Sequence, residues 1–112
     1  MVESLGDRRR RKTTRMQIRW EEDALADLID LRTYLSENNP ESANRMANKI
    51  INATNLLADY PMLGKVGRIH KTRELVISGT PYTLIYLPES DLISILRIFH
   101  QSRSWNNFLR KA

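Results

Sequence analysis

The fold is decided by a run near the C-terminal end of the 112-residue chain, Leu92-Ile93-Ser94-Ile95-Leu96-Arg97-Ile98-Phe99-His100. Apolar side chains occupy most of its positions on both alternating faces. A strand with two apolar faces is typical of the interior of a sheet that is covered on both sides. We therefore place this run at the centre of a β-sheet.

Two shorter strand-like runs precede it, and each ends at a turn signal. Arg73–Ile77 is followed by Ser78-Gly79-Thr80-Pro81, and Tyr82–Leu87 is followed by Pro88-Glu89-Ser90-Asp91. Before them, residues 61–67 contain proline and two glycines and are typical of a loop. Because strands joined by tight turns pair with their neighbours in sequence, the three runs predict an antiparallel meander.

The N-terminal half predicts one strand and two helices. Met16–Trp20 alternates apolar and polar residues, as a half-buried strand does. From Glu21 to Asn38 the period becomes helical, with an apolar face and an opposite acidic face that we interpret as solvated. The apolar face comprises Ala24, Leu25, Leu28, Ile29, Leu31 and Leu35, and the acidic face comprises Asp23, Asp27, Asp30 and Glu37, with Tyr34 among them.

The second helix begins directly after the first. Asn39 is suited to the N-cap, and Pro40 is suited to the first helical position, where its missing N–H leaves no bond unmade. The helical period then continues to Pro61. Two helices joined by so few residues predict an antiparallel hairpin.

Together these elements predict an α+β fold of order β-α-α-β-β-β. The helical hairpin packs on a four-stranded, mainly antiparallel, curved sheet. We expect residues 16–112 to form this single domain, ending in a short helix over 101–112 that is docked by Trp105, Phe108 and Leu109.

The net charge of +5 is concentrated in two places. Residues 1–15 contain Arg8, Arg9, Arg10, Arg11, Lys12 and Arg15 against Glu3 and Asp7, which gives +4 of the +5. We interpret this segment as a disordered arm, serving either to bind nucleic acid or only as a leader before a domain that starts at Met16. Within the domain the first third is acidic and the last half is basic, so an anionic partner is expected at the C-terminal half.

Composition excludes several classes of protein. The chain has no cysteine, and its two histidines are far apart in sequence, so neither disulfides nor a metal site is expected. It lacks GxGxxG, Walker-type, HExxH and GxSxG motifs, so no nucleotide, cofactor or hydrolase chemistry is indicated. No apolar run approaches the roughly 18 residues of a membrane span, and we expect a cytoplasmic protein without a membrane partner.

Three motifs in register give the sequence a family resemblance. They are Gly64-Lys65-Val66-Gly67-Arg68, the run from Thr72-Arg73-Glu74-Leu75 through Gly79-Thr80-Pro81-Tyr82 to Tyr86, and the ending from Ile95-Leu96-Arg97 through His100 to Arg103 and Trp105. The chain resembles the RelE/ParE superfamily of bacterial type II toxins over about residues 16–107. The resemblance implies a small toxin held inactive, as a hetero-oligomer, by an antitoxin encoded beside it.

The superfamily has two kinds of activity. The RelE branch cleaves mRNA on the ribosome, which requires cations around the phosphate and groups that move protons. Here the residues for such chemistry are Arg73, His100 and Arg103. However, Thr83 stands where the nuclease arginine is expected, and no tyrosine follows Tyr86.

The resemblance is better to the ParE branch, which poisons DNA gyrase without a catalytic set. We therefore expect a gyrase inhibitor that arrests growth, with a ribosome-dependent mRNA endoribonuclease and a degenerate, non-toxic binding module as alternatives. The residues expected to bind the target or the antitoxin are Arg68, Arg73, Tyr86, Arg97, His100, Arg103 and Trp105.

Ordinary structural roles stand beside these assignments. His100 can simply satisfy a neighbouring backbone carbonyl, and Trp105 can anchor the terminal segment. Arg103 can pair with Glu74. Tyr82, Leu84 and Tyr86 alternate on one strand face, which favours the core.

Overall fold

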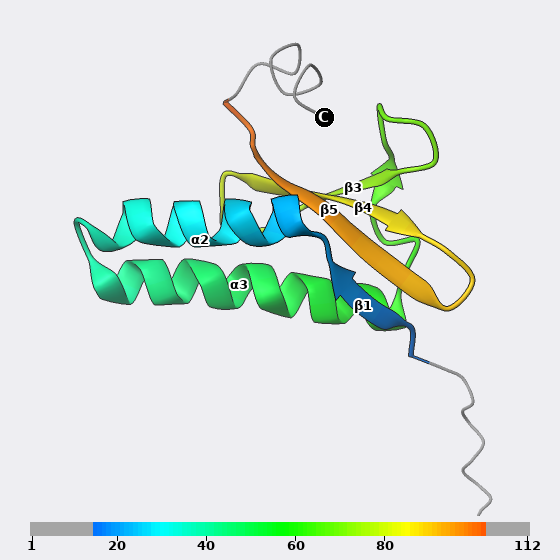
Figure 1. Ribbon diagram of the computed structural model, residues 1–112, viewed down its shortest axis with the longest axis horizontal. Coiled ribbons are helices and arrows are strands. Elements are labelled where there is room, and N and C mark those ends of the chain that lie inside the picture. Colours follow the sequence, from blue (N-terminus) through cyan, green and yellow to red (C-terminus); the bar gives the residue numbers. More distant parts are fainter. Residues whose placement is uncertain (1–14, 103–112) are drawn as a thin grey trace, which may run out of the picture.

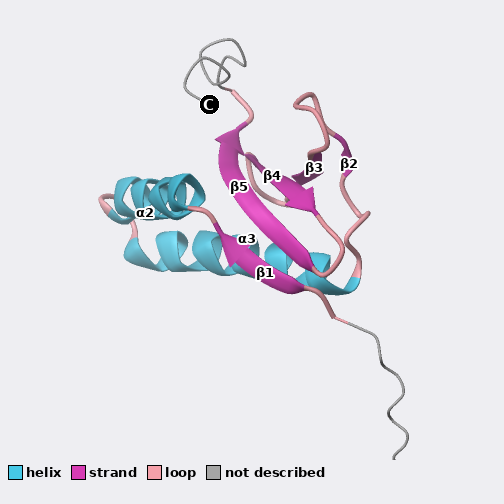
Figure 2. Cartoon of the chain, turned by 45° about the vertical axis from the view of Figure 1, so that its right-hand side comes forward, coloured by secondary structure: helices cyan, strands magenta, loops and turns pink. Residues whose placement is uncertain are grey.

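In a computed structural model of the protein, residues 15–102 are described, and they form two helices and a five-stranded sheet. The strands are β1 (Gln17–Trp20), β2 (Lys65–Val66), β3 (Arg73–Val76), β4 (Tyr82–Pro88) and β5 (Leu92–His100), and the helices are α2 (Glu22–Ser36) and α3 (Pro40–Asp59). Figures 1 and 2 show the two helices lying side by side on one face of the curved sheet. The α+β prediction is confirmed.

The sheet order is β1-β5-β4-β3-β2, so the apolar run at 92–100 lies in the middle. β5 pairs in parallel with β1 and antiparallel with β4, and β3 and β4 complete the expected meander. The predicted strand count was one too low. β2 has only two residues, which is too short to give a periodic signal, and it forms by pairing with Arg73 and Glu74 of β3.

The helices begin and end close to their expected positions. Asn39 caps α3, since its side-chain oxygen accepts from the backbone N–H groups of Glu41 and Ser42, and Pro40 is the first helical residue. α2 has no side-chain cap, but Glu22 and Asp23 place negative charge in its first turn, where the helix dipole favours it. No helix of the described part is both long and apolar enough to cross a membrane.

The core lies between the helices and the sheet. Alternate residues of β4 and β5 point at the helices, and the fully buried side chains of this layer are Ile50, Leu57, Leu84, Tyr86, Ile93 and Ile95. A smaller cluster on the opposite face joins Ile85 and Phe99. Because the register of β4 and β5 shifts between Ile85 and Tyr86, β5 carries an irregularity at Leu96 and Arg97.

Candidate partner-binding surface

Five basic side chains gather at the outer end of the sheet, and we call them the basic corner: Lys65, Arg68, His70, Lys71 and Arg73. The first four are exposed on β2 and on the loop that joins β2 to β3, and Arg73 is half-buried on β3. Sequence reasoning identified only Arg68 and Arg73. The other three follow from the basic run Lys65-Val66-Gly67-Arg68-Ile69-His70-Lys71, which places four of the five basic side chains within seven residues.

The loop of the basic corner is held by short-range hydrogen bonds. The Gly67 N–H donates to the Thr72 carbonyl at 2.9 Å, and the Thr72 hydroxyl donates to the Ile69 carbonyl at 2.6 Å. Lys71 has a φ of 68°, in the left-handed region that closes such a turn. These bonds fix the backbone that carries the cations.

Glu74 braces the loop from within the sheet. It is only 4% exposed, and its Oε2 accepts the backbone N–H of Arg68 at 2.9 Å. The carboxylate therefore faces the loop backbone. The sequence also allowed Glu74 to pair with Arg103, but Arg103 lies outside the described part of the chain, so that pairing stays a prediction.

Tyr86 supports the basic corner from the core and is not a contact surface. It is 0% exposed, and its hydroxyl donates to the Pro61 carbonyl at 2.8 Å and accepts the Gly64 N–H at 2.9 Å. Burial raises the pKa of Tyr86 above the ordinary value of 10.0, and the hydrogen bond from Gly64 and the charge of Arg73 partly offset this rise.

Gly64 also connects Tyr86 to Arg73. The Gly64 carbonyl accepts a hydrogen bond from Arg73 Nη1 at 2.6 Å. The assignment of Tyr86 to partner binding is corrected, and the alternation that favoured the core is confirmed.

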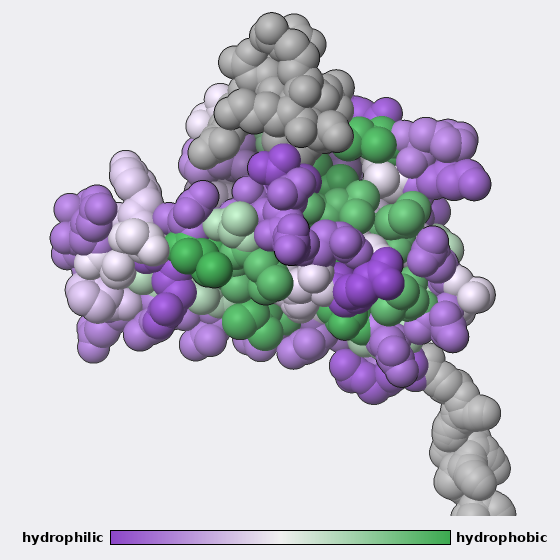
Figure 3. Space-filling view, viewed as in Figure 1, coloured by the Kyte–Doolittle hydropathy of each residue, from purple (hydrophilic) through white to green (hydrophobic). Residues whose placement is uncertain are grey.

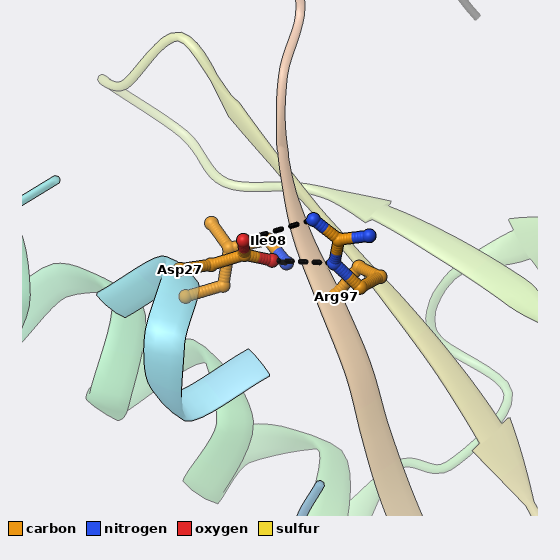
Figure 4. A network of polar contacts seen from close by, with 3 residues as sticks. All are labelled: Asp27, Arg97 and Ile98. Atoms are coloured by element: carbon orange, nitrogen blue, oxygen red, sulfur yellow. Dashed lines mark hydrogen bonds and ion pairs between the residues drawn. The ribbon is translucent and has the colours of Figure 1, made fainter. Parts of the chain in front are cut away.

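Arg97 is also occupied within the protein. Its guanidinium binds both carboxylate oxygens of Asp27 on α2, at 2.8 and 3.0 Å, and both side chains are less than one-fifth exposed (Figure 4). The same carboxylate accepts the backbone N–H of Ile98 at 2.9 Å. The hydrogen bond with Asp27 raises the pKa of Arg97 against the effect of burial. Asp27 was expected on a solvated face, and this expectation was wrong.

His100 lies at the far end of β4 from the basic corner. Its Nδ1 accepts the backbone N–H of Ser102 at 3.1 Å, and its ring stands edge-on to Tyr82 with centroids 5.2 Å apart. The sequence suggested that His100 could satisfy a backbone carbonyl. Its Nδ1 instead satisfies the backbone N–H of Ser102. On β4, Tyr82 pairs with His100 of β5, and Tyr86 pairs with Arg73 of β3. Tyr82 and Tyr86 are four residues apart, so the positions of His100 and Arg73 are separated by about 13 Å along the direction of β4.

The remaining assigned residues, Arg103 and Trp105, lie outside the described residues, as do most of the basic N-terminal arm and all of the expected terminal helix except Gln101 and Ser102, which form a turn. Among residues 15–102, no group of three or more His, Cys, Asp or Glu side chains is placed to hold a metal ion. What the described part of the chain offers is a fixed cationic surface suited to recognition of an anionic partner.

A second surface is apolar and lies on the helical hairpin. Leu25, Ile29 and Ile51 are 44%, 62% and 40% exposed, and Figure 3 shows apolar surface spread over the two helices. A shallow groove of about 390 Å³ between α2 and α3 includes Ile29 and Ala43 in its lining. This surface belongs to different elements from the basic corner.

Comparison with known proteins gives consistent matches. Residues 18–105 match the family described as the ParE toxin of the type II toxin-antitoxin system parDE. Y4kP of Sinorhizobium fredii, a protein named as a toxin, is 36% identical over 96 residues, covering 86% of this chain and 99% of the relative. Toxin RelE2 of Caulobacter vibrioides is 38% identical over 87 residues, covering 78% and 97%.

Solved structures show the same fold. The chromosomal ParDE toxin-antitoxin system of P. aeruginosa includes a chain that superposes with a TM-score of 0.68 at 24% identity, covering 76% of this chain and 95% of that one. The toxin-antitoxin complex RelBE2 of Mycobacterium tuberculosis includes one with a TM-score of 0.60 at 24% identity, covering 78% and 99%.

Proposed function

The chain belongs to the ParE toxin family of type II toxin-antitoxin systems, and from this premise we propose that it arrests growth by inhibiting DNA gyrase through surface recognition. An antitoxin encoded beside it would neutralise it by covering the surface that meets the target. The solved relatives are toxin-antitoxin systems, which supports an antitoxin partner here.

One observation carries the choice of gyrase over mRNA cleavage. Cleavage would require groups such as Arg73 and His100 to converge on one phosphodiester, within hydrogen-bond reach of its oxygens. They instead lie on strands to either side of β4, Arg73 opposite Tyr86 and His100 opposite Tyr82. The Arg73 guanidinium is also held by the Gly64 carbonyl. Thr83, at the position where the nuclease arginine is expected, is a buried residue at 5% exposure.

The basic corner supports recognition without chemistry. Its side chains extend from β2, from β3 and from a connecting loop whose backbone is already fixed by Thr72 and Glu74, so little conformational entropy is lost when a partner docks. Clustered cations also accelerate encounter with an anionic partner. We assign the basic corner as the surface that meets the target and that the antitoxin covers.

The test is direct inhibition of purified gyrase. The full-length protein should block supercoiling of plasmid DNA by gyrase and should accumulate cleaved DNA, and the antitoxin should reverse both effects. Primer extension of cellular mRNA during induction of the toxin should show no new codon-phased ends. If supercoiling proceeds normally while such ends appear, gyrase is not the target.

The mRNA endoribonuclease remains the second candidate because the Caulobacter relative is named RelE2. In that case the same primer-extension map shows cuts phased with codons, and gyrase is unaffected. A third outcome, induction without antitoxin that leaves growth unchanged, identifies a degenerate binding module.

A further inference from the structure

A cavity of about 440 Å³ opens at the other end of the molecule from the basic corner, between α2 and the end of β5. Its apolar lining includes Leu31 and Ile98, and its polar lining includes Asp30, Tyr34 and His100. β1 pairs with β5 only as far as Ile95, so this part of the β5 edge has no strand beside it. The cavity therefore combines an apolar lining, aromatic side chains and a carboxylate in a space large enough for a long side chain.

The charges around the cavity favour a cation. Asp27 also lines it, but both of its oxygens are engaged by Arg97 and one of them by the Ile98 amide as well. Asp30 lies one helical turn further along α2 and is exposed. Because Arg97 offsets the charge of Asp27, Asp30 leaves the lining of the cavity with a net negative charge, since no lysine or arginine is among the described residues that line it.

The aromatic groups indicate which cation fits. Tyr34 is 67% exposed at the cavity, and the edge-on pair of Tyr82 and His100 forms another part of its lining. A planar guanidinium can stack on such rings while donating two hydrogen bonds to a carboxylate, whereas an ammonium group offers only a point charge. A metal ion is a poor fit, since no group of three suitable ligands exists among the described residues.

We infer that this cavity accepts an arginine side chain from the polypeptide that neutralises the toxin. The inference rests on the proposed function for the identity of that polypeptide, whereas the chemistry of the cavity rests on its own residues. The basic corner and the cavity lie toward opposite ends of β4, so a segment that reaches both would carry an acidic region at one end and an arginine at the other. That separation of charge would fix the direction in which the segment lies on the toxin.

The experiment is a titration of the isotope-labelled, full-length protein followed by NMR of its backbone amides. The probe is N-acetyl-L-arginine amide, and the matched controls are the citrulline analogue, which is neutral and nearly the same shape, and the lysine analogue. We expect the arginine probe to shift the amides of Asp30, Tyr34, Ile98 and His100, with a dissociation constant on the order of 1 mM. The citrulline and lysine probes should bind at least about fivefold more weakly.

Two variants locate the site. Asp30→Asn and Tyr34→Leu change exposed side chains, and each should weaken binding of the arginine probe at least about threefold while the rest of the spectrum is unchanged. Glu37→Gln, an exposed residue at the end of the same helix and absent from the cavity lining, should have no effect. Equal binding of all three probes, shifts confined to other surfaces, or no saturable shift overturns the inference. None of these readouts uses gyrase or the antitoxin, so failure here is distinct from failure of the proposed function.

Discussion

Arg97 and Asp27 join the irregular part of β5 to the side of α2, with Nε to Oδ2 at 2.8 Å and Nη2 to Oδ1 at 3.0 Å. β1 ends at Trp20 and pairs with β5 only through Ile95, so the Ile98 amide has no strand partner on that side. Asp27 accepts this amide as well. A single carboxylate therefore accepts the N–H of Ile98 at the part of the β5 edge that β1 does not cover. With this amide occupied, the edge is less able to pair with a strand of another chain.

Asp27→Ala should lower the free energy of unfolding by about 2–3 kcal/mol, because it leaves a half-buried guanidinium without its carboxylate and a strand amide without an acceptor. Urea unfolding monitored by circular dichroism measures this loss. Asp30→Ala, one turn away and exposed, is the control and should change stability by less than about 0.5 kcal/mol. Combining Asp27→Ala with Arg97→Met should cost less than Asp27→Ala alone, and equal costs would contradict the assignment of the ion pair.

Stability should fall in alkaline solution through Tyr86. Burial raises the pKa of its phenol above 10.0 in the folded state, whereas the unfolded state titrates at the ordinary value. Its contribution is therefore complete below about pH 10 and is lost as the pH rises toward the folded pKa, since only the unfolded chain releases the proton there. The difference in unfolding free energy between the wild type and Tyr86→Phe should be constant below about pH 10 and should shrink as the pH rises above it. A difference that stays constant as the pH rises above about 10 would contradict this account.

Much of the fold is visible in the sequence because local rules and packing agree. Asn39 and Pro40 mark the start of α3, because the first N–H groups of a helix need an acceptor such as the Asn39 side chain. The apolar residues on both faces of 92–100 indicate a central strand, as the sheet order shows. β2 could not be predicted in this way. Its two residues have no period of their own and are ordered by Arg73 and Glu74, which are neighbours in space.

The site residues were harder to assign for a related reason. The helical projection placed Asp27 on an acidic face, but it could not show that β1 stops short and leaves the Ile98 amide beside that face. Family resemblance placed Tyr86 and Arg97 at a partner surface, yet each has internal hydrogen-bond partners that lie far away in sequence. Side chains that serve the fold and side chains that serve recognition have the same sequence pattern until their partners are located.

Gly64→Ala should destabilise the protein by about 1–3 kcal/mol, because a Cβ there would lie 2.7 Å from the Glu74 carbonyl oxygen and 2.8 Å from the Tyr86 ring. Neither group can move freely, since one is sheet backbone and the other is fully buried. Gly79→Ala is the comparison: its φ of +76° costs about 1 kcal/mol, but its nearest contact is the flexible end of Lys49 at 3.0 Å. Thermal and urea unfolding should rank Gly64→Ala as the more damaging, and the reverse order would show that the space around Gly64 is not limiting.

Asn39→Ala should cost about 1 kcal/mol by removing the acceptor of the first free N–H groups of α3. Asn38→Ala provides a matched control, because it is the same substitution one residue earlier at a position that makes no capping bond. The shift in the urea midpoint, with an unchanged slope, measures the difference. Equal shifts for the two variants would remove Asn39 from the role of cap.

Charge reversal at the basic corner should weaken the encounter with gyrase. The double variant Lys65→Glu and Lys71→Glu changes exposed side chains whose removal leaves the bracing bonds of Thr72 and Glu74 intact. We expect the association rate with purified gyrase to fall at least about tenfold at low salt and the gap to narrow as salt is raised, because exposed charges are screened. The control is the double variant Arg45→Glu and Lys49→Glu, which changes two exposed side chains of α3 outside the basic corner, alters the net charge by the same amount and should change the rate by much less. If both proteins lose the same fraction of their rate, net charge alone steers the encounter and the basic corner has no special role.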